Sequence, residues 1–327
     1  MKIKIKLPHW KFLTVVLLFL TAFAVLYSLG VKRANRYDLG KESFKEVVIN
    51  KGASVEEISK ILVREDLINS RALFKLYVYI SNKSLQAGNF YVPTNISVVE
   101  LANLLGKGSF QKKYTFLEGW RVEQMAELLP KDVQNEFLKS SYTKEGFMFP
   151  DTYFFLESAI GEEIAQTLSQ TFEDKIKVFD KEIKASSLSL EEIVILASII
   201  EREAKSFDEK ATIAGILVKR YQNGWPLQAD ATIQYAKDLN AFTCASLSDC
   251  VWWRPLFATD LDIESSYNTY KYAGLPPTPI CSPGLESIRA VLEYKETPYW
   301  FYLTGNDGVT RFSETVEEQT ANIQKYL

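Results

Sequence analysis

Residues 193–200 form a run of apolar positions with no polar stripe, which predicts a helix that is buried nearly all round. Ser189 precedes this run at capping-box spacing from Glu192, so we expect the helix to begin there and to extend to Lys205. Near its end, Glu201 lies over small or apolar positions of the preceding turn. Loss of hydration there would favour the protonated carboxyl group that a general acid needs. The alternative is that Glu201 pairs with Lys205 or reaches water where the helix leaves the core.

A compact module precedes this helix in the sequence. The alternation of apolar and polar positions predicts a strand at 44–50, a capped helix opening at Ser54 and a second helix at 70–80. A further strand is expected at 86–92, and a third helix starts at Ser97. The strand–helix–helix–strand order indicates a small α+β module.

The rest of the chain, 110–327, mixes helices and short strands without regular alternation. We expect a strand at 110–116, helices at 121–130, 161–180, 189–205 and 208–222, and a hairpin of 299–303 and 309–313. This irregular order favours an α+β fold over a doubly wound sheet. At 327 residues the chain is long enough for two domains besides an anchor.

The N-terminal region contains a long apolar segment. Phe12–Gly30 carries no charged residue and spans about 19 residues, enough to cross a hydrocarbon layer of roughly 30 Å as a helix. We therefore expect a transmembrane helix at 12–30, a cytoplasmic N-terminus at 1–11 and a polar linker at 31–43. A cleaved signal peptide is the competing interpretation, since Ser28 is small enough to precede a cleavage site. Either interpretation sends the remainder of the chain out of the cytoplasm.

Charge divides the chain unevenly and excludes several kinds of chemistry. The first 36 residues hold seven Lys or Arg and no acidic residue, and the remainder holds 31 basic against 41 acidic residues. An acidic ectodomain repels phosphates, so nucleic acid is excluded as the main partner. The single histidine is His9, so serine–histidine hydrolysis and histidine-ligated zinc lack their usual base or ligand. We expect no metal and no cofactor, and chemistry that depends on carboxylates, hydroxyls and amides.

The three cysteines are too few for a disulfide scaffold. Cys244 and Cys250 are close enough in sequence to form a disulfide in an oxidising exterior, with Cys281 left over. Equally, all three are compatible with small, buried apolar side chains. The sequence leaves both interpretations open.

Five motifs in one order resemble the endolytic murein (peptidoglycan) transglycosylase family, also called MltG or YceG-like. They are Leu117-Glu-Gly-Trp120, Glu145–Tyr153, Ile195–Ala204, Leu227–Tyr235, and Ser266–Tyr270 continuing through Gly274–Pro277 to Ser282-Pro-Gly284. The resemblance covers essentially the whole chain, and 44–105 resembles the LysM-like domain of that family. Two departures are mild: Leu117 and Ser282 stand where the family commonly has Pro and Asn. A larger one is in the C-terminal hairpin region, where Thr310 and Gln319 replace histidines of the family pattern.

The resemblance implies a lyase that cuts glycan strands of peptidoglycan internally, near the membrane where new strands emerge. The bond joins N-acetylmuramic acid to N-acetylglucosamine, and the product ends in a 1,6-anhydro sugar. The chain would comprise a LysM-like module at 44–109 and a catalytic domain at 110–327. It would be a single-pass protein of the cell membrane with its catalytic domain on the extracytoplasmic side, associated with cell-wall synthases.

The catalytic glutamate of the family falls on Glu201. Cleaving a glycosidic bond requires a proton for the leaving oxygen, and a hydrolase usually adds a second carboxylate. A lytic transglycosylase uses the 6-hydroxyl of its substrate as nucleophile, so one carboxyl group can serve first as acid and then as base.

Five further residues are candidates for binding substrate, and each also has a structural interpretation. Asp151 and Tyr153 follow a proline and either face the sugar or form a turn. Asp230 either orients the catalytic glutamate or caps a helix. Asn268 and Tyr270 either offer donors suited to acetamido and hydroxyl groups or only build their loop.

Two other functions stay open. A hydrolytic muramidase would use Glu201 with a second carboxylate such as Asp230 and would leave a reducing sugar instead of an anhydro end. A membrane-tethered peptidoglycan-binding protein would depend on the LysM-like module alone, with an inert second domain.

Overall fold

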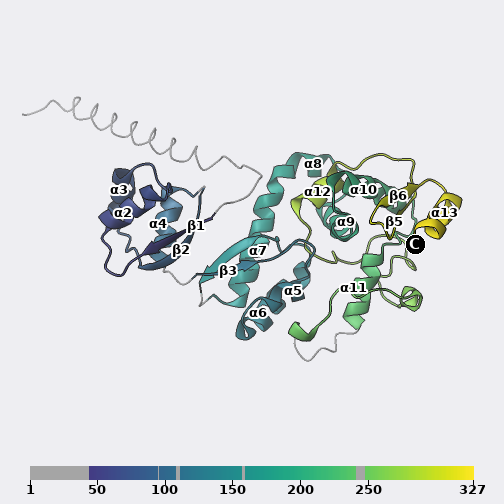
Figure 1. Ribbon diagram of the computed structural model, residues 1–327, viewed down its shortest axis with the longest axis horizontal. Coiled ribbons are helices and arrows are strands. Elements are labelled where there is room, and N and C mark those ends of the chain that lie inside the picture. Colours follow the sequence, from purple (N-terminus) through teal and green to yellow (C-terminus); the bar gives the residue numbers. More distant parts are fainter. Residues whose placement is uncertain (1–43, 95, 108–110, 157–158, 241–246) are drawn as a thin grey trace, which may run out of the picture. The chain divides into compact units, whose positions relative to one another are not determined.

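The computed structural model describes residues 44–327, apart from residue 95 and segments 108–110, 157–158 and 241–246. The chain divides into two compact units (Figure 1). The first ends at Lys113 and includes Phe154–Ser158, and the second comprises Tyr114–Tyr153 and Ala159–Leu327.

The transmembrane helix expected at 12–30 lies outside the described residues, as do its flanks. Within the described part of the chain, no helix combines the length and the apolar character that crossing a membrane requires.

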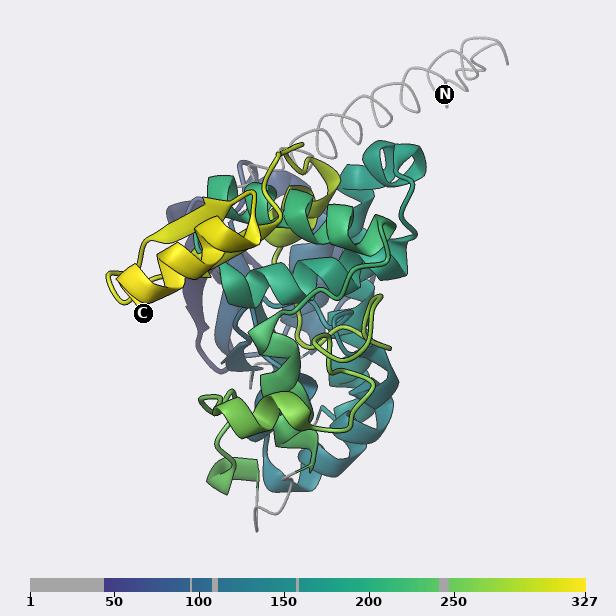
Figure 2. The same cartoon turned by 90° about the vertical axis from the view of Figure 1, so that its right-hand side faces the viewer.

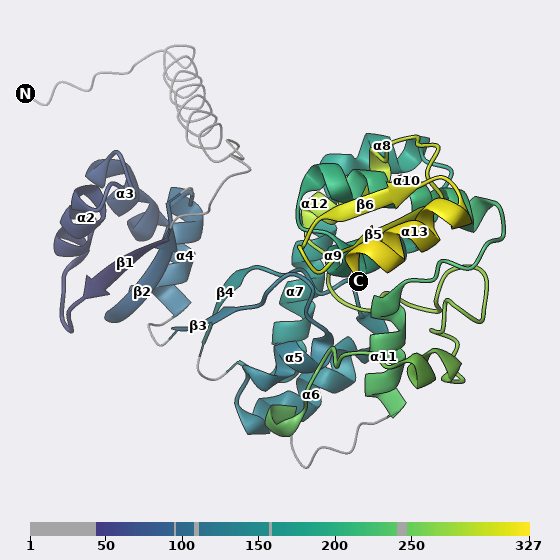
Figure 3. The same ribbon diagram turned by 45° about the vertical axis from the view of Figure 1, so that its right-hand side comes forward.

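The first unit is an antiparallel strand pair with three helices. Strands β1 and β2 pair with Phe44 opposite Pro93 and Ile49 opposite Gly88. The elements are β1 (Phe44–Ile49), α2 (Val55–Arg64), α3 (Arg71–Ile80), β2 (Gly88–Pro93) and α4 (Val98–Lys107). All five follow the predicted order, so the small α+β module is confirmed (Figure 3). Its likeness to LysM remains a prediction.

Local sequence explains why these elements form. Ser54 and Glu57 make the reciprocal bonds of a capping box at the start of α2, and the Ser70 hydroxyl caps α3. In β1, Val47 and Ile49 alternate with exposed positions, so one face of the strand enters the core. The helices contribute further apolar side chains to the same core.

The second unit is mixed α+β, which confirms the predicted fold class. Its strands form two short sheets, β3 with β4 and β5 with β6, and the boundary between the units runs through the first of these. The C-terminal helix, coloured yellow, lies along the β5–β6 hairpin (Figure 2). The elements are β3 (Gln111–Thr115), α5 (Val122–Glu127), α6 (Lys131–Ser141), β4 (Thr152–Leu156), α7 (Gly161–Ile176), α8 (Asp180–Ala185), α9 (Leu190–Glu203), α10 (Phe207–Gln222), α11 (Asp230–Asn240), α12 (Leu285–Leu292), β5 (Phe301–Thr304), β6 (Thr310–Ser313) and α13 (Val316–Tyr326).

Helix α9 is the central helix of this unit. It begins with the predicted capping box of Ser189 and Glu192, and every residue from 193 to 200 is buried. It packs against α10, α11 and α12, which explains the absence of a polar stripe. The helix ends at Glu203, two residues earlier than expected, so Glu201 lies in its last turn.

Other predictions need adjustment. The helix expected at 161–180 stops at Ile176 and continues as a 3₁₀ turn, Lys177–Phe179, and the short α8. Cys250 is disulfide-bonded and Cys281 is a free, buried thiol. Cys244, the partner that the sequence offers, lies outside the described residues.

Candidate functional site

Glu201 is nearly buried and receives three hydrogen bonds. Its side chain is 9% exposed. The hydroxyl group of Ser287 and the backbone N–H of Gly284 donate to its Oε2 at 2.7 and 3.0 Å. The ammonium group of Lys210 donates to its Oε1 at 3.3 Å. Lys210, and not the Lys205 of the alternative prediction, is therefore the cation bonded to Glu201, and all three partners suit an ionised carboxylate.

Two helix starts supply these donors. A capping box of Ser206 and Glu209 starts α10 directly after α9, and this turn brings Lys210 back onto the end of α9. Helix α12 begins after its N-cap, Gly284, whose N–H faces Glu201, while Ser287 lies in the first turn. Backbone N–H groups at a helix start have no partner within the helix, so they favour a carboxylate there.

A second carboxyl group, that of Glu118, lies beside this pair. The N–H of Gly119 donates to the carbonyl of Ser282 at 2.9 Å, and the N–H of Ser282 donates to the carbonyl of Trp120 at 2.8 Å. These reciprocal bonds hold the Leu117–Trp120 motif against the start of α12. A Cβ atom at Gly284 would lie 1.9 Å from Glu118 Oε1, so the Glu118 carboxyl group lies close against this glycine.

The environment of Glu118 differs from that of Glu201. The Glu118 side chain is exposed, whereas Glu201 and Lys210 are 9% and 5% exposed. Partial burial of its carboxyl group raises the pKa of Glu118, and the negative charge of Glu201 raises it further. Lys210 acts in the opposite direction, and the charges of Glu286 and Asp151 add to the rise. The site thus holds two carboxyl groups in unlike surroundings.

Glu203, two residues after Glu201 on α9, belongs to a different cluster. The Tyr302 hydroxyl group and the N–H of Ala231 bond to its carboxyl group. The hydroxyl group of Tyr270 donates to Asp230 Oδ1 at 2.6 Å. Burial raises the pKa of Glu203 to about 7, with the charge of Asp230 as the next cause.

Three of the residues predicted to bind substrate occupy these two clusters. Asp151 accepts the N–H of Thr152 at 2.7 Å and lies 3.4 Å from Lys175, and its charge acts on Glu118. Asp230 starts α11 and, with Tyr270, lies beside Glu203. The charge of Asp151 therefore acts on a carboxyl group beside Glu201, and Asp230 and Tyr270 lie together beside Glu203.

The other two have internal partners. Tyr153 is buried, and its hydroxyl group donates to the carbonyl of Phe149 at 2.8 Å. Asn268 is 0% exposed, and its amide group donates to the carbonyls of Leu261 and Ile263 at 2.9 and 2.8 Å. In this geometry Tyr153 ties β4 to the segment before it and Asn268 stabilises its own loop, and direct contact with substrate remains a prediction.

Sequence reasoning assigned no role to four of the groups that surround Glu201. Lys210 had a usable signal, because a lysine in the first turn after a predicted helix–helix corner can reach back to the preceding helix. Glu118 stands inside a motif that the family resemblance already marked. Gly284 and Ser287 could not be connected to Glu201 without knowing how α12 packs against α9.

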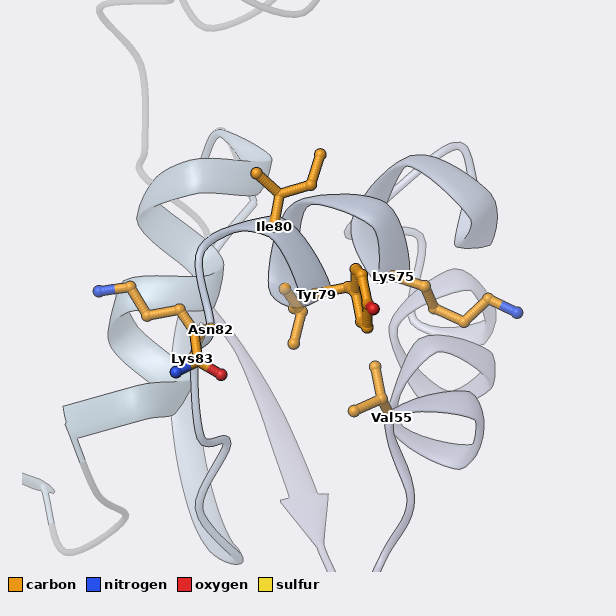
Figure 4. Close-up of a pocket in the computed structure, with 7 residues that line it drawn as sticks. Val55, Lys75, Tyr79, Ile80, Asn82 and Lys83 are labelled. Carbon is orange, nitrogen blue, oxygen red and sulfur yellow. The ribbon is translucent and has the colours of Figure 1, made fainter.

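A recess lies in the first unit. A groove of about 740 Å³ there involves the end of α3 and the start of α2 (Figure 4). It is lined by Val55, Lys75, Val78, Tyr79, Ile80, Asn82 and Lys83. None of these seven side chains carries a carboxyl group, so acid–base chemistry on a sugar has its candidates in the second unit. In the described part of the chain, no group of three or more His, Cys, Asp and Glu is placed to hold a metal ion.

Comparisons with known proteins agree over most of the chain. An "Endolytic murein transglycosylase" of Bacillus subtilis (strain 168) is 27% identical over 323 residues, which cover 88% of this chain and 86% of that protein. A protein of the same name from Streptococcus pneumoniae (strain R6) is 23% identical over 336 residues, covering 89% of this chain and 60% of the longer relative.

A solved structure and a family model complete these comparisons. A yceG-like protein from Listeria monocytogenes, known from a 2.6 Å crystal structure, matches with a TM-score of 0.53 and 27% identity. The match covers 86% of this chain and 99% of that one. The sequence model of the YceG-like family matches residues 47–325. The chain therefore belongs to the YceG-like family.

Proposed function

We propose that this protein is an endolytic peptidoglycan lytic transglycosylase, a lyase with Glu201 as a catalytic carboxyl group. The observation that carries the proposal is Glu201 itself, held at the end of a buried helix by a lysine, a helix-start N–H and a hydroxyl group. A group fixed in this way can be positioned accurately against a reacting sugar. The names of the B. subtilis and S. pneumoniae relatives support the same activity.

The proposed reaction cleaves the bond between N-acetylmuramic acid and N-acetylglucosamine in nascent glycan strands. The leaving oxygen must receive a proton while positive charge develops on the sugar ring. The 6-hydroxyl of the muramic acid then closes on its own C1, which gives a 1,6-anhydro end. The carboxylate of Glu201 is suited to stabilise the developing positive charge and to accept the hydroxyl proton.

The test is digestion of purified glycan strands, followed by mass spectrometry of the new ends. The full-length protein should release 1,6-anhydro ends, and Glu201→Gln should release none while staying folded as judged by circular dichroism. Glu191→Gln is the matched control, because Glu191 is an exposed glutamate in the first turn of the same helix. If Glu201→Gln cuts strands as fast as the control, the assignment is wrong.

Hydrolysis is the second candidate, since the site contains a second carboxyl group, Glu118, that could activate water. The same spectra distinguish the two, because hydrolysis leaves a reducing muramic acid 18 Da heavier than the anhydro form. A wild-type protein that cuts no strand at all would instead favour a wall-binding role, with the groove of the first unit as its contact surface.

We also propose that residues 12–30 anchor the protein in the cell membrane, with the described units on the extracytoplasmic side and a LysM-like first unit. Glycan strands emerge at that surface, so the substrate and cell-wall synthases would be close by. Protease added to intact spheroplasts should digest residues 44–327, and protection of the described units would contradict this placement.

A further inference from the structure

We propose that Glu118 delivers the proton to the leaving sugar oxygen, while Glu201 is the carboxylate that accepts the proton of the 6-hydroxyl. This inference rests on the proposed function and assigns its acid and base to different residues. It replaces a single carboxyl group that must change roles between two steps.

The contacts of Glu201 are those of a hydrogen-bond acceptor. Its two oxygens accept hydrogen bonds from Ser287, Gly284 and Lys210, at 2.7, 3.0 and 3.3 Å. The Gly284 and Lys210 partners can only donate at these positions, so each oxygen of Glu201 acts as an acceptor.

Glu118 has the opposite properties. Its side chain is exposed, so a polysaccharide can reach it, and one carboxyl oxygen rests against the α-carbon of Gly284. The Gly284 N–H bonds to Glu201, so both carboxyl groups lie against the same glycine.

The charges around Glu118 favour its protonated form. Three acidic residues face it: Glu201 from α9, Glu286 from α12 and Asp151 from the loop before β4. One cation, Lys210 from α10, acts against them, but it is bonded to Glu201 and lies 3.6 Å from Glu286. Partial burial and these acidic neighbours raise the pKa of Glu118. A carboxyl group with a raised pKa beside a second carboxyl group that only accepts hydrogen bonds suits an acid paired with a base.

The proton balance closes without a further reactant. The Glu118 proton passes to the leaving oxygen as the C1–O bond breaks, which gives the free hydroxyl of N-acetylglucosamine. The 6-hydroxyl forms the new C1–O bond and gives its proton to Glu201. Glu118 is then ionised and Glu201 protonated, and transfer of that proton between the neighbouring groups, directly or through water, restores the starting state.

The first experiment uses full-length wild-type protein and two substrates across pH. One is polymeric glycan, whose leaving oxygen needs a proton; the other is a short glycan with 4-nitrophenol linked to its terminal N-acetylmuramic acid, whose leaving group needs none. We expect the polymer rate to fall at high pH, where Glu118 loses its proton, and the nitrophenol rate to stay level. Parallel falls for both substrates would overturn the proposal.

The second experiment compares variants on the same two substrates. Glu118→Gln should slow polymer cleavage by about 10²–10⁴-fold and leave nitrophenol release within about tenfold of wild type. Glu201→Gln should slow both. Glu127→Gln is the matched control, because burial also raises the pKa of this α5 carboxyl group, which the Trp252 indole bonds at 3.3 Å; both of its rates should stay unchanged.

The outcomes separate this inference from the proposed function. If the wild type cuts neither substrate, the proposed function fails. If the wild type cuts both and Glu118→Gln, folded as judged by circular dichroism, cuts polymer at the wild-type rate or loses both activities equally, then the role given to Glu118 is wrong. Should Glu118→Gln not fold, the wild-type pH comparison decides alone.

Discussion

Helix α9 ends with two glutamates that lie two residues apart and have unlike surroundings. Glu201 is bonded by a lysine, a backbone N–H at a helix start and a serine hydroxyl. Glu203 is bonded by a tyrosine hydroxyl and a backbone N–H, and the charge that affects its pKa most is that of the acidic Asp230. Because successive positions on a helix point in different directions, one helix end presents its two acids to two different clusters.

The difference shows that burial alone does not decide what a carboxyl group does. Both side chains are largely enclosed by protein, yet a cation compensates the charge of Glu201, while an anion opposes the charge of Glu203. The first arrangement suits a group that works as a carboxylate. The second makes ionisation costly, so its effect should appear in stability rather than in catalysis.

The largest expected effect is on activity. Glu201→Gln should lower the rate of strand cleavage by about 10³-fold or more, because the carboxylate is lost from the proposed reaction centre. Glu203→Gln should lower it by less than about tenfold, since its cluster is separate. Rates of new-end formation on purified strands measure both. Equal losses in the two folded variants would remove the distinction between the clusters.

The next effect is on stability. Lys210→Met should destabilise the protein by about 3–5 kcal/mol at neutral pH, because it leaves the nearly buried Glu201 carboxylate without its cation. Urea unfolding followed by tryptophan fluorescence measures this change. The double variant Lys210→Met with Glu201→Gln should recover most of the loss. If the double variant is no more stable than Lys210→Met, the charge of Glu201 is not the cause.

A pH-dependent effect should follow from Glu203. Its pKa rises from 4.5 to about 7 on folding, so the folded state keeps a proton that the unfolded chain releases between these values. The contribution of Glu203 to the free energy of unfolding is therefore complete below pH 4.5 and is lost as the pH rises through about 7. We expect a loss of roughly 2 kcal/mol, less than the full pKa shift would give, because Glu203 is partly exposed to solvent. Melting temperatures from pH 4 to 8 should decline less for Glu203→Gln than for wild type. Parallel curves would show that another group is responsible.

The smallest effect concerns the tyrosine of the second cluster. Tyr270→Phe removes the 2.6 Å hydrogen bond to Asp230 and should cost about 1 kcal/mol of unfolding free energy. Tyr272→Phe is the matched control, because its hydroxyl group bonds to the exposed Glu264 at 2.9 Å in water. The control should change stability by only a few tenths of a kcal/mol. If Tyr270→Phe costs no more than Tyr272→Phe, the Tyr270–Asp230 bond contributes little.

The features that the sequence predicted depend on short-range rules. The capping box and the apolar run of α9 act within a few turns, and they correctly placed Glu201 at the end of a buried helix. The strands and helices of the first unit follow from the same kind of local pattern. By contrast, α13 was missed, because none of its residues is buried and it has no strong apolar stripe to detect.

The site could be predicted only in part, because its geometry depends on packing between distant segments. Glu118, Gly284 and Ser287 meet Glu201 only when α12 packs on α9 and the Leu117–Trp120 motif pairs with Ser282. Asn268 illustrates the opposite difficulty: an amide suited to a sugar is equally suited to backbone carbonyls. Residue type alone does not choose between these partners.

The reciprocal bonds that join Gly119 and Trp120 to Ser282 have a consequence for biosynthesis. A chain emerges from the ribosome with its N-terminal part first, and contacts between distant segments form late. The glutamate-bearing helix can thus be complete while its serine and glycine donors are still unsynthesised. A nascent or prematurely terminated chain would lack the complete site around Glu201. Glycan-cleaving activity would therefore appear only near the end of translation.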